Sequence, residues 1–185
     1  MEILSLNPYI VLCHDVILPS EQEFLKTQSS KRLEGARALD QVKNEVVFNF
    51  IRTSKATWLK KNSDNVTRRL SHWIEDVSNL DSNIGDLYQI INYGVGGLFE
   101  AHSDTMRKDE LQDVPQGGAT LFNNLNLTVF PKAGAALFWF NLDNAGDTDL
   151  FTVHTGCPVI VGSKWIMTKW VYDLGQELRV PCPRI

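Results

Sequence analysis

Two histidines and one aspartate have the residue types and the spacing of a metal site. His102 and Asp104 are separated by one residue, so in an extended chain both side chains point to the same side of the backbone. His154 follows much later, in another segment that is predicted to be extended. Two imidazoles and one carboxylate on one side of a metal leave other coordination positions free for a co-substrate and dioxygen. We therefore predict that these three residues hold a metal ion, although spacing alone also fits histidines that are ordinary core or surface groups.

A lysine downstream of the last histidine suggests what the co-substrate is. Lys164 enters an otherwise apolar segment, and a buried cation is costly unless it has a partner. A dicarboxylic co-substrate that binds the metal through one end would supply this partner at its other end. The alternative, a lysine in a solvent-facing turn, also fits the spacing.

A run of glycines, Gly94-Val95-Gly96-Gly97, invites a phosphate-binding interpretation. No Lys-Ser/Thr pair follows it, and it leads into a predicted strand rather than opening a helix, which argues against a P-loop or a dinucleotide fold. A turn that presents the next strand fits better.

The strand-rich second half of the chain must position these groups. Its apolar and β-branched segments are separated by Gly, Asn and Asp, and they lie at Tyr88–Tyr93, Leu125–Phe130, Ala135–Asn141, Pro158–Val161 and Trp165–Tyr172. Several short strands with turns between them predict a sandwich or a barrel. Val159 to Trp165 is predicted to form a hairpin that turns at Gly162-Ser163, which places Ile166, Thr168 and Trp170 on the same face as Lys164.

Two helices are predicted ahead of the strands. Ser20 and Glu23 have the spacing of a capping box and predict a helix from about Ser20 to Leu33. The second helix is predicted from apolar residues at spacings of three and four: Val66, Leu70, Trp73, Ile74, Val77 and Leu80. This order predicts an α+β fold with the helices packed outside a β core.

The composition limits the class of protein. The 185 residues are 43% hydrophobic and 22% charged, which is typical of one globular domain covering 1–185. A net charge of -4 and a pI near 5.5 argue against a nucleic-acid partner. No apolar run is long enough to predict a membrane span, and the first residues lack the basic region of a signal peptide.

Two sequons, Asn65-Val66-Thr67 and Asn126-Leu127-Thr128, fit a secretory protein but also arise by chance.

Taken together and in order, several motifs resemble the catalytic domain of the animal, collagen-type prolyl 4-hydroxylase α subunit. The similarity covers nearly the whole chain. The motifs are Pro8-Tyr9-Ile10-Val11, the segment from Tyr88 to Gly97, His102-x-Asp104, Arg107-Lys108-Asp109-Glu110, Gln116-Gly117-Gly118-Ala119-Thr120, Phe138-Trp139-Phe140-Asn141, His154-x-x-Cys157-Pro158-Val159, Gly162-x-Lys164-Trp165 and Gly175-Gln176-Glu177.

This resemblance implies a double-stranded β-helix, or jelly-roll, core with flanking N-terminal helices. It makes His102, Asp104 and His154 ligands of Fe(II), and Lys164 the partner of the distal carboxylate of 2-oxoglutarate. Tyr93 would add a hydrogen bond in the same pocket, and Thr168 would form part of its wall. The implied reaction is 4-hydroxylation of a peptidyl proline, coupled to decarboxylation of 2-oxoglutarate to succinate, with L-ascorbate as the rescuing reductant.

The resemblance also implies a cellular context. It suggests the endoplasmic reticulum lumen, a proline-containing or collagen-like substrate, and protein disulfide isomerase as a second subunit. Cys157 and Cys182 match positions that look disulfide-bonded in the family, which favours an oxidising compartment.

The chain departs from the family pattern after Glu110, where only Leu111-Gln112 stand in place of a loop and a hydrophobic strand. The absent strand would be an interior one, so its neighbours would keep unpaired backbone groups. Ser103 and Thr105 also replace residues that are commonly aromatic in relatives. Two alternatives therefore stay open: a catalytically inactive relative that binds metal or a partner protein, and a dioxygenase for another substrate.

Overall fold

The computed structural model describes residues 1–36, 38–40, 45–47, 52–104, 109–110, 114–143 and 145–176. These residues form two α-helices, α1 (Pro19–Ser30) and α2 (Asn65–Ser78), and two 3-10 turns, η1 (Asn123–Leu125) and η2 (Leu150–Thr152). The strands are β1 (Glu2–Leu6), β2 (Tyr9–Cys13), β3 (Glu34–Gly35), β4 (Ala38–Asp40), β5 (Glu45–Val47), β6 (Lys55–Leu59), β7 (Tyr88–Tyr93), β8 (Phe99–His102), β9 (Asp109–Glu110), β10 (Gln116–Gly117), β11 (Thr120–Phe122), β12 (Leu127–Val129), β13 (Ala136–Trp139), β14 (His154–Gly156), β15 (Val159–Val161) and β16 (Lys164–Thr168).

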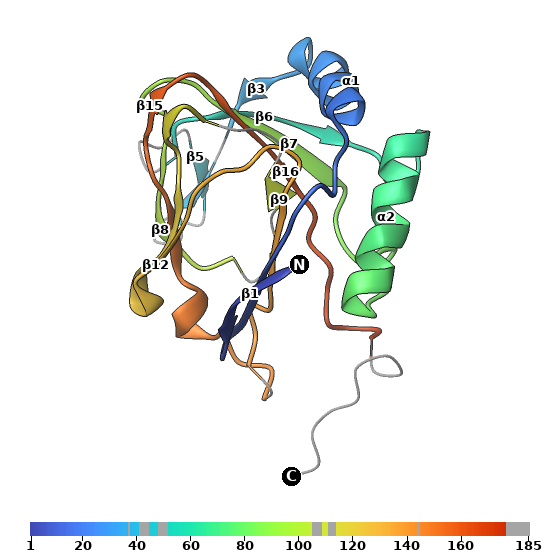
Figure 1. The fold of residues 1–185 in the computed structure, drawn as a ribbon, viewed down its shortest axis with the longest axis vertical. Helices are drawn as coiled ribbons and strands as arrows, with labels where there is room; N and C mark the ends of the chain where they lie inside the picture. The colour runs from blue at the N-terminus through green and yellow to red at the C-terminus, as the bar shows by residue number, and fades with distance from the viewer. Residues whose placement is uncertain are drawn as a thin grey trace.

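The strands build antiparallel sheets that lie to one side of the two helices (Figure 1). The largest sheet has the order β3-β6-β7-β16-β9, and a four-stranded sheet has the order β12-β11-β14-β8. A three-stranded sheet, β1-β2-β13, and two small pairs, β10-β15 and β4-β5, complete the set. The predicted mixture of helices and antiparallel strands is therefore confirmed.

The apolar stripe of the second predicted helix packs α2 onto the core. Leu70 and Ile74 are buried, and Leu80, which lies just beyond the helix, is buried as well. The predicted helix is confirmed. Asp64 caps its start by accepting the backbone N–H of Thr67 at 2.8 Å, and a left-handed Asn79 ends it.

The predicted start of the first helix was wrong in its details. Pro19 opens α1, because proline fixes a helical φ and needs no hydrogen-bond acceptor at that position. The helix therefore begins one residue earlier than predicted, and Glu21, not Glu23, accepts the backbone N–H of Leu18 at 2.9 Å. It ends at Ser30 rather than at Leu33.

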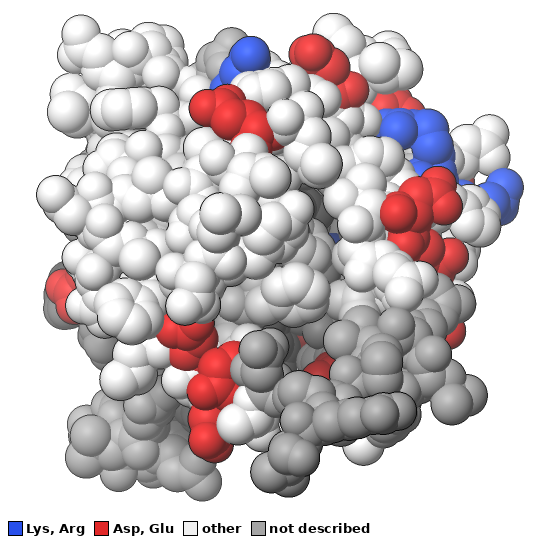
Figure 2. Space-filling model, turned by 60° about the horizontal axis from the view of Figure 1, so that its bottom comes forward, with Lys and Arg blue, Asp and Glu red and all other residues white. Residues whose placement is uncertain are grey.

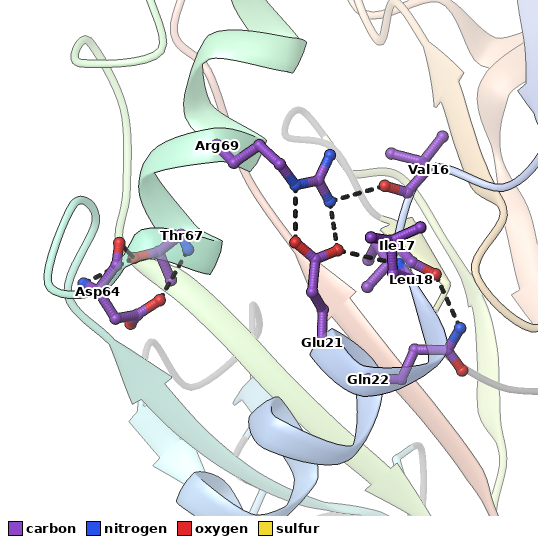
Figure 3. A network of polar contacts seen from close by, with 8 residues as sticks. All are labelled: Val16, Ile17, Leu18, Glu21, Gln22, Asp64, Thr67 and Arg69. Atoms are coloured by element: carbon purple, nitrogen blue, oxygen red, sulfur yellow. Dashed lines mark hydrogen bonds and ion pairs between the residues drawn. The ribbon is translucent and has the colours of Figure 1, made fainter.

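Glu21 also joins the two helices. Figure 3 shows its carboxylate facing the guanidinium of Arg69 on α2, with Nε–Oε1 and Nη2–Oε2 distances of 2.7 and 2.5 Å. Arg69 Nη2 donates a further hydrogen bond to the carbonyl oxygen of Val16 at 2.8 Å. This paired contact fixes α1, α2 and the segment after β2 relative to one another.

Four of the five predicted strand segments differ from the observed strands at their ends. Tyr88–Tyr93 forms β7 as predicted, whereas β12, β13 and β15 are shorter than their predicted segments. The last segment forms β16, which starts at Lys164 and stops at Thr168. Packing against neighbours, which local patterns do not contain, sets these ends.

The predicted hairpin between β15 and β16 was wrong. β15 pairs with β10, and β16 pairs with β7 and β9, so the two strands belong to different sheets. Gly162, with a φ of 91°, carries the chain from one sheet to the other. Lys164 and Ile166 nevertheless share one face, because the alternation within β16 does not depend on a hairpin.

Candidate metal centre

Strand pairing brings the predicted metal ligands together. His102 is the last residue of β8 and His154 is the first residue of β14, and the two residues are direct partners in the antiparallel register. Asp104 follows β8 by two residues. One potential ligand atom from each of the three residues lies within 4.8 Å of the other two.

The carboxylate of Asp104 lies between the two imidazoles. Its Oδ1 is 3.3 Å from His102 Nε2, and its Oδ2 is 3.7 Å from His154 Nε2. The two rings have centroids 4.3 Å apart. His154 is only 1% exposed, so one side of the cluster is sealed from solvent.

Backbone carbonyls fix the orientation of both rings. His102 Nδ1 donates to the carbonyl oxygen of Glu100 at 2.6 Å, and His154 Nδ1 donates to that of Thr152 at 2.9 Å. A neutral imidazole with its proton on Nδ1 presents a lone pair on Nε2. Both lone pairs then face carboxylate oxygens, an arrangement that calls for a cation between them, and such outer hydrogen bonds are typical of metal-binding histidines. The donor set fits a divalent first-row metal.

Aromatic side chains hold the two histidines in place. The Phe99 ring stacks on His102 at a centroid distance of 3.5 Å. On the other ring, Phe122 and Trp139 pack against His154 at 5.7 and 5.1 Å. Trp139 is itself fixed, since its Nε1 donates to Asn141 Oδ1 at 2.7 Å.

A cavity of about 450 Å³ lies beside His154 and contains the predicted lysine. Lys164 is 5% exposed and lines the cavity, as does Tyr93, its direct partner across β7 and β16. Lys164 Nζ donates to the carbonyl oxygen of Gly118 at 2.8 Å. Lys164 and His154, one of the three clustered residues, therefore line one cavity, and the alternative of a solvent-facing lysine is wrong.

The remaining predicted residues have mixed outcomes. Ile166 lines the cavity, whereas Thr168 is fully buried in the same strand but is not among the lining residues. Trp170 is likewise not part of the lining. Six further residues line the cavity without having been predicted to do so: Phe99, Thr120, Leu137, Trp139, Gly156 and Cys157. Thr120 and Trp139 stand inside quoted motifs, so the motifs held a signal for them.

The predicted disulfide involves a residue outside the described part of the chain. Among the described residues Cys13 is buried and Cys157 is half-buried, they form no disulfide with each other, and Cys182 lies beyond the described part of the chain. The pairing of Cys157 with Cys182 stays a prediction. Neither of the described helices is long and apolar enough to cross a membrane.

Comparison with solved structures defines the class of fold. The collagen prolyl hydroxylase of Paramecium Bursaria Chlorella virus-1, solved as a 2-oxoglutarate complex, matches with a TM-score of 0.69 over 87% of this chain and 94% of that one, at 19% identity. A prolyl hydroxylase from Trichoplax adhaerens, solved with a hypoxia-inducible-factor peptide, gives a TM-score of 0.61 over 89% and 83% of the two chains, at 18% identity. The fold is that of the 2-oxoglutarate–Fe(II) oxygenases.

Sequence comparison identifies the relatives more narrowly. Prolyl 4-hydroxylase subunit α-1 of Rattus norvegicus is 38% identical over 195 aligned residues, which include 95% of this chain and 36% of the relative. The chain is therefore a homologue of the prolyl 4-hydroxylase α subunits, and it spans about a third of their length. No protein-family model matches the chain.

Proposed function

We propose that residues 1–185 form an Fe(II)- and 2-oxoglutarate-dependent dioxygenase domain that hydroxylates peptidyl proline at C4. The observation that carries this proposal is the shared cavity: His154, which clusters with His102 and Asp104, and the buried Lys164 both line it. A facial set of three protein ligands leaves room for a chelating co-substrate, and the lysine supplies a charge for its other end. Homology to the prolyl 4-hydroxylase α subunits supports the same chemistry.

Each residue then has a distinct task. His102, Asp104 and His154 would hold Fe(II), which supplies the activation of dioxygen when bound. Lys164 would pair with the distal carboxylate of 2-oxoglutarate, and the hydroxyl of Tyr93 would hydrogen-bond to it. Thr168 has a buried Oγ1 with no hydrogen-bond partner and lies in the same strand as Lys164, behind the residues that line the cavity.

The walls of the cavity exclude water from the reacting groups. Trp139 and Ile166 are 1% and 4% exposed, and both line the cavity next to His154 or Lys164. An apolar wall strengthens the attraction between the lysine and a carboxylate, because it lowers the local dielectric constant. Water excluded from the site also cannot quench a reactive oxidant.

An aromatic pair near the cluster fits a proline-rich substrate. Trp58 is 45% exposed and lies 5.9 Å from Trp170, whose buried Nε1 has no hydrogen-bond partner. The exposed indole ring of Trp58 offers a flat apolar face of the kind on which extended proline-rich peptides pack. Arg52 connects this pair to the metal cluster: it donates to Gln89, the register partner of Trp58, and lies 4.8 Å from the Phe99 ring.

The arrangement of the sheets supports a double-stranded β-helix that lacks one interior strand. β9 pairs with β16 and lies beside β13, and among the described residues no other strand pairs with β16 on this side. The aligned stretch in the rat relative covers 195 positions, more than the 185 residues of this chain, so the relative carries residues that the chain lacks. This supports the predicted shortening after Glu110.

Further parts of the proposal rest on homology. L-ascorbate would restore iron left oxidised by turnover without substrate, and protein disulfide isomerase would be a second subunit in the endoplasmic reticulum lumen. A collagen-like or other proline-containing peptide would be the substrate. The curated relatives are about three times longer than the aligned part, so these partners are proposed for a domain and not for a whole enzyme.

A second candidate function is a relative that binds metal or a partner protein without turnover. Among the described residues only β9 lies between β16 and β13, which favours it, because Leu137 on β13 is part of the cavity wall. A wall bordered by β9 alone would leave 2-oxoglutarate less well enclosed.

One assay separates the two functions. Purified, folded chain would be given Fe(II), 2-oxoglutarate, ascorbate and a proline-rich peptide, and succinate would be measured with and without the peptide. Peptide-stimulated succinate supports the hydroxylase, and iron binding without succinate supports the inactive relative.

Lys164→Met should raise the KM for 2-oxoglutarate by roughly 10- to 100-fold, since a charge-assisted hydrogen bond contributes about 1.5–3 kcal/mol. Lys60→Met, at an exposed lysine, is the matched control, and an unchanged KM in Lys164→Met would refute the assigned role.

A further inference from the structure

The two sequons lie in very different surroundings. Asn126-Leu127-Thr128 spans the connection from η1 into β12, at the tip of the β11–β12 hairpin. Asn65-Val66-Thr67 forms the first turn of α2. Both contain the Asn-x-Thr pattern that accepts N-linked glycans, so only their structural settings distinguish them.

Asn126 is presented to solvent. Its side chain is exposed, and it has a left-handed backbone conformation with φ 51° and ψ 34° at the end of η1. Thr128, the second recognition residue, is also exposed. β12 is the edge strand of its sheet and pairs only with β11 among the described residues, so this tip can open locally at small cost.

Asn65 offers a less accessible sequon. Thr67 is fully buried, and its Oγ1 donates to the carbonyl oxygen of Asp64 at 3.2 Å (Figure 3). The backbone carbonyl oxygen of Thr67 accepts a hydrogen bond from the hydroxyl of Ser71 at 2.9 Å. Asn65 Oδ1 accepts a hydrogen bond from Arg68 at 3.2 Å. Releasing Thr67 to a transferase would require the first turn of α2 to unfold.

An exposed apolar surface adjoins the Asn126 tip. Phe130, Leu150 and Phe151 are 71%, 67% and 53% exposed, respectively. Asn124 Nδ2 donates to the carbonyl oxygen of Leu150 at 2.7 Å, which holds η2, and with it Leu150 and Phe151, against η1 beside the tip. Phe130 directly follows β12, which starts at the tip. Figure 2, turned toward this end of the molecule, shows a broad area with few charged side chains. Such a patch promotes association unless something covers it.

We propose that Asn126 carries an N-linked oligosaccharide that shields this apolar surface. In the transfer, Asn126 Nδ2 forms a bond to the anomeric carbon of an oligosaccharide carried on a polyprenyl diphosphate. The bond from that carbon to the diphosphate oxygen breaks, the lipid diphosphate leaves, and the amide nitrogen loses one proton. No oxidant or reductant is needed. The proposal rests on the lumenal location in the proposed function, but it does not depend on catalytic activity.

The test expresses the full chain in eukaryotic cells behind a cleavable lumenal signal. Intact mass would be measured before and after an amidase that removes N-linked glycans, and glycopeptide mapping would locate the modified residue. Asn126→Gln and Thr128→Ala should abolish the mass increase, whereas Thr128→Ser should retain it. Asn65→Gln is the matched control and should leave the mass increase at Asn126 unchanged.

Two results would overturn the proposal. One is a folded, signal-cleaved chain without a glycan at Asn126, and the other is a mass increase that disappears in Asn65→Gln but persists in Asn126→Gln. The mass readout is independent of succinate production, so failure of the hydroxylase assay would leave this result interpretable. The shielding role further predicts that Asn126→Gln aggregates at a lower concentration than the glycosylated chain, by light scattering at equal folded fraction, and equal thresholds would refute that role.

Discussion

The sheet that holds the metal ligands and the sheets that face it differ in completeness. In the order β12-β11-β14-β8, β11 and β14 each have a partner on both sides, and His102 pairs directly with His154. On the other side, the described residues that pair with β16, apart from β7, are the two of β9. Among the described residues, β13 pairs only with β2. The candidate metal ligands therefore lie on the four-stranded sheet, here called the complete sheet. The cavity also borders β16 and β13, which the described residues join only through β9, and this part of the fold is here called the incomplete side.

A cleft of about 330 Å³ marks the incomplete side. Leu137 and Phe138, consecutive residues on opposite faces of β13, both line it, so it lies at the edge of that strand. Leu137 also lines the cavity next to His154, so one side chain separates the cavity from the cleft. Metal binding and enclosure of the co-substrate thus depend on different parts of the fold and can be tested separately.

The largest effect is expected at the complete sheet. His154→Ala removes one of three candidate ligands. Loss of a hydrogen bond to a metal ligand already lowers metal affinity by up to about 100-fold, so loss of the ligand itself should lower the affinity for Fe(II) by at least about 100-fold. Anaerobic calorimetry with Fe(II) would measure it. His72→Ala, at an exposed histidine on α2, is the control and should bind normally. Equal iron affinity in His154→Ala and the parent chain would show that the cluster is not the metal site.

Core substitutions on the two sides provide the next comparison. Phe122 is fully buried in the complete sheet, so Phe122→Ala should lower the free energy of unfolding by about 3–5 kcal/mol. Leu137→Ala should cost only about 2 kcal/mol, the low end for such a change, because its neighbours can relax into the adjoining voids.

Urea denaturation of both variants would give the two values. Ile90→Ala, at a fully buried residue of β7, is the control for an ordinary aliphatic core position and should cost more than Leu137→Ala. A Leu137→Ala loss as large as that of Phe122→Ala would mean that the β13 edge is packed as tightly as the complete sheet.

The clustering of the three candidate metal ligands could be predicted from the sequence. The His102-x-Asp104 spacing places two side chains on one face by strand geometry, and His154 was the available third ligand in another segment predicted to be extended, a choice that the resemblance supported. Strand β7 was also predicted correctly, since its buried run needs no partner to be recognised. The β15–β16 hairpin was wrong because the partner of β15 is β10, a two-residue strand with no periodic signal. The start of the first helix was predicted one residue too late, because Pro19 favours the first position of a helix more strongly than Ser20 favours the capping position.

The smallest effect concerns a lysine in the cleft on the incomplete side. Lys169 is 2% exposed and lines the cleft, and its Nζ donates to the carbonyl oxygen of Asp86 at 2.5 Å. Burial, and secondarily the nearby charge of Lys61, lowers its pKa from 10.5 to about 8, against the opposing attraction of Asp86 and Asp81. The Tyr88 ring, 5.6 Å from Nζ, provides a further weak contact.

The sign of the resulting pH dependence follows from this lowered pKa. Between pH 8 and 10.5 the unfolded chain keeps the Lys169 proton while the folded chain has lost it, so the free energy of unfolding rises with pH across this window. The Lys169 contribution should reach about 2 kcal/mol between pH 7 and pH 9.5. Lys169→Met should lack this rise. Urea denaturation at a series of pH values would give the free energy of unfolding of Lys169→Met and of the parent chain, and the contributions of other titrating groups cancel in the difference between the two. The same pH dependence of the free energy of unfolding in Lys169→Met and the parent chain would contradict this prediction. It would mean that Lys169 is hydrated in the folded protein, because water enters the cleft when the β13 edge opens. The incomplete side would then be looser in solution than its packing indicates.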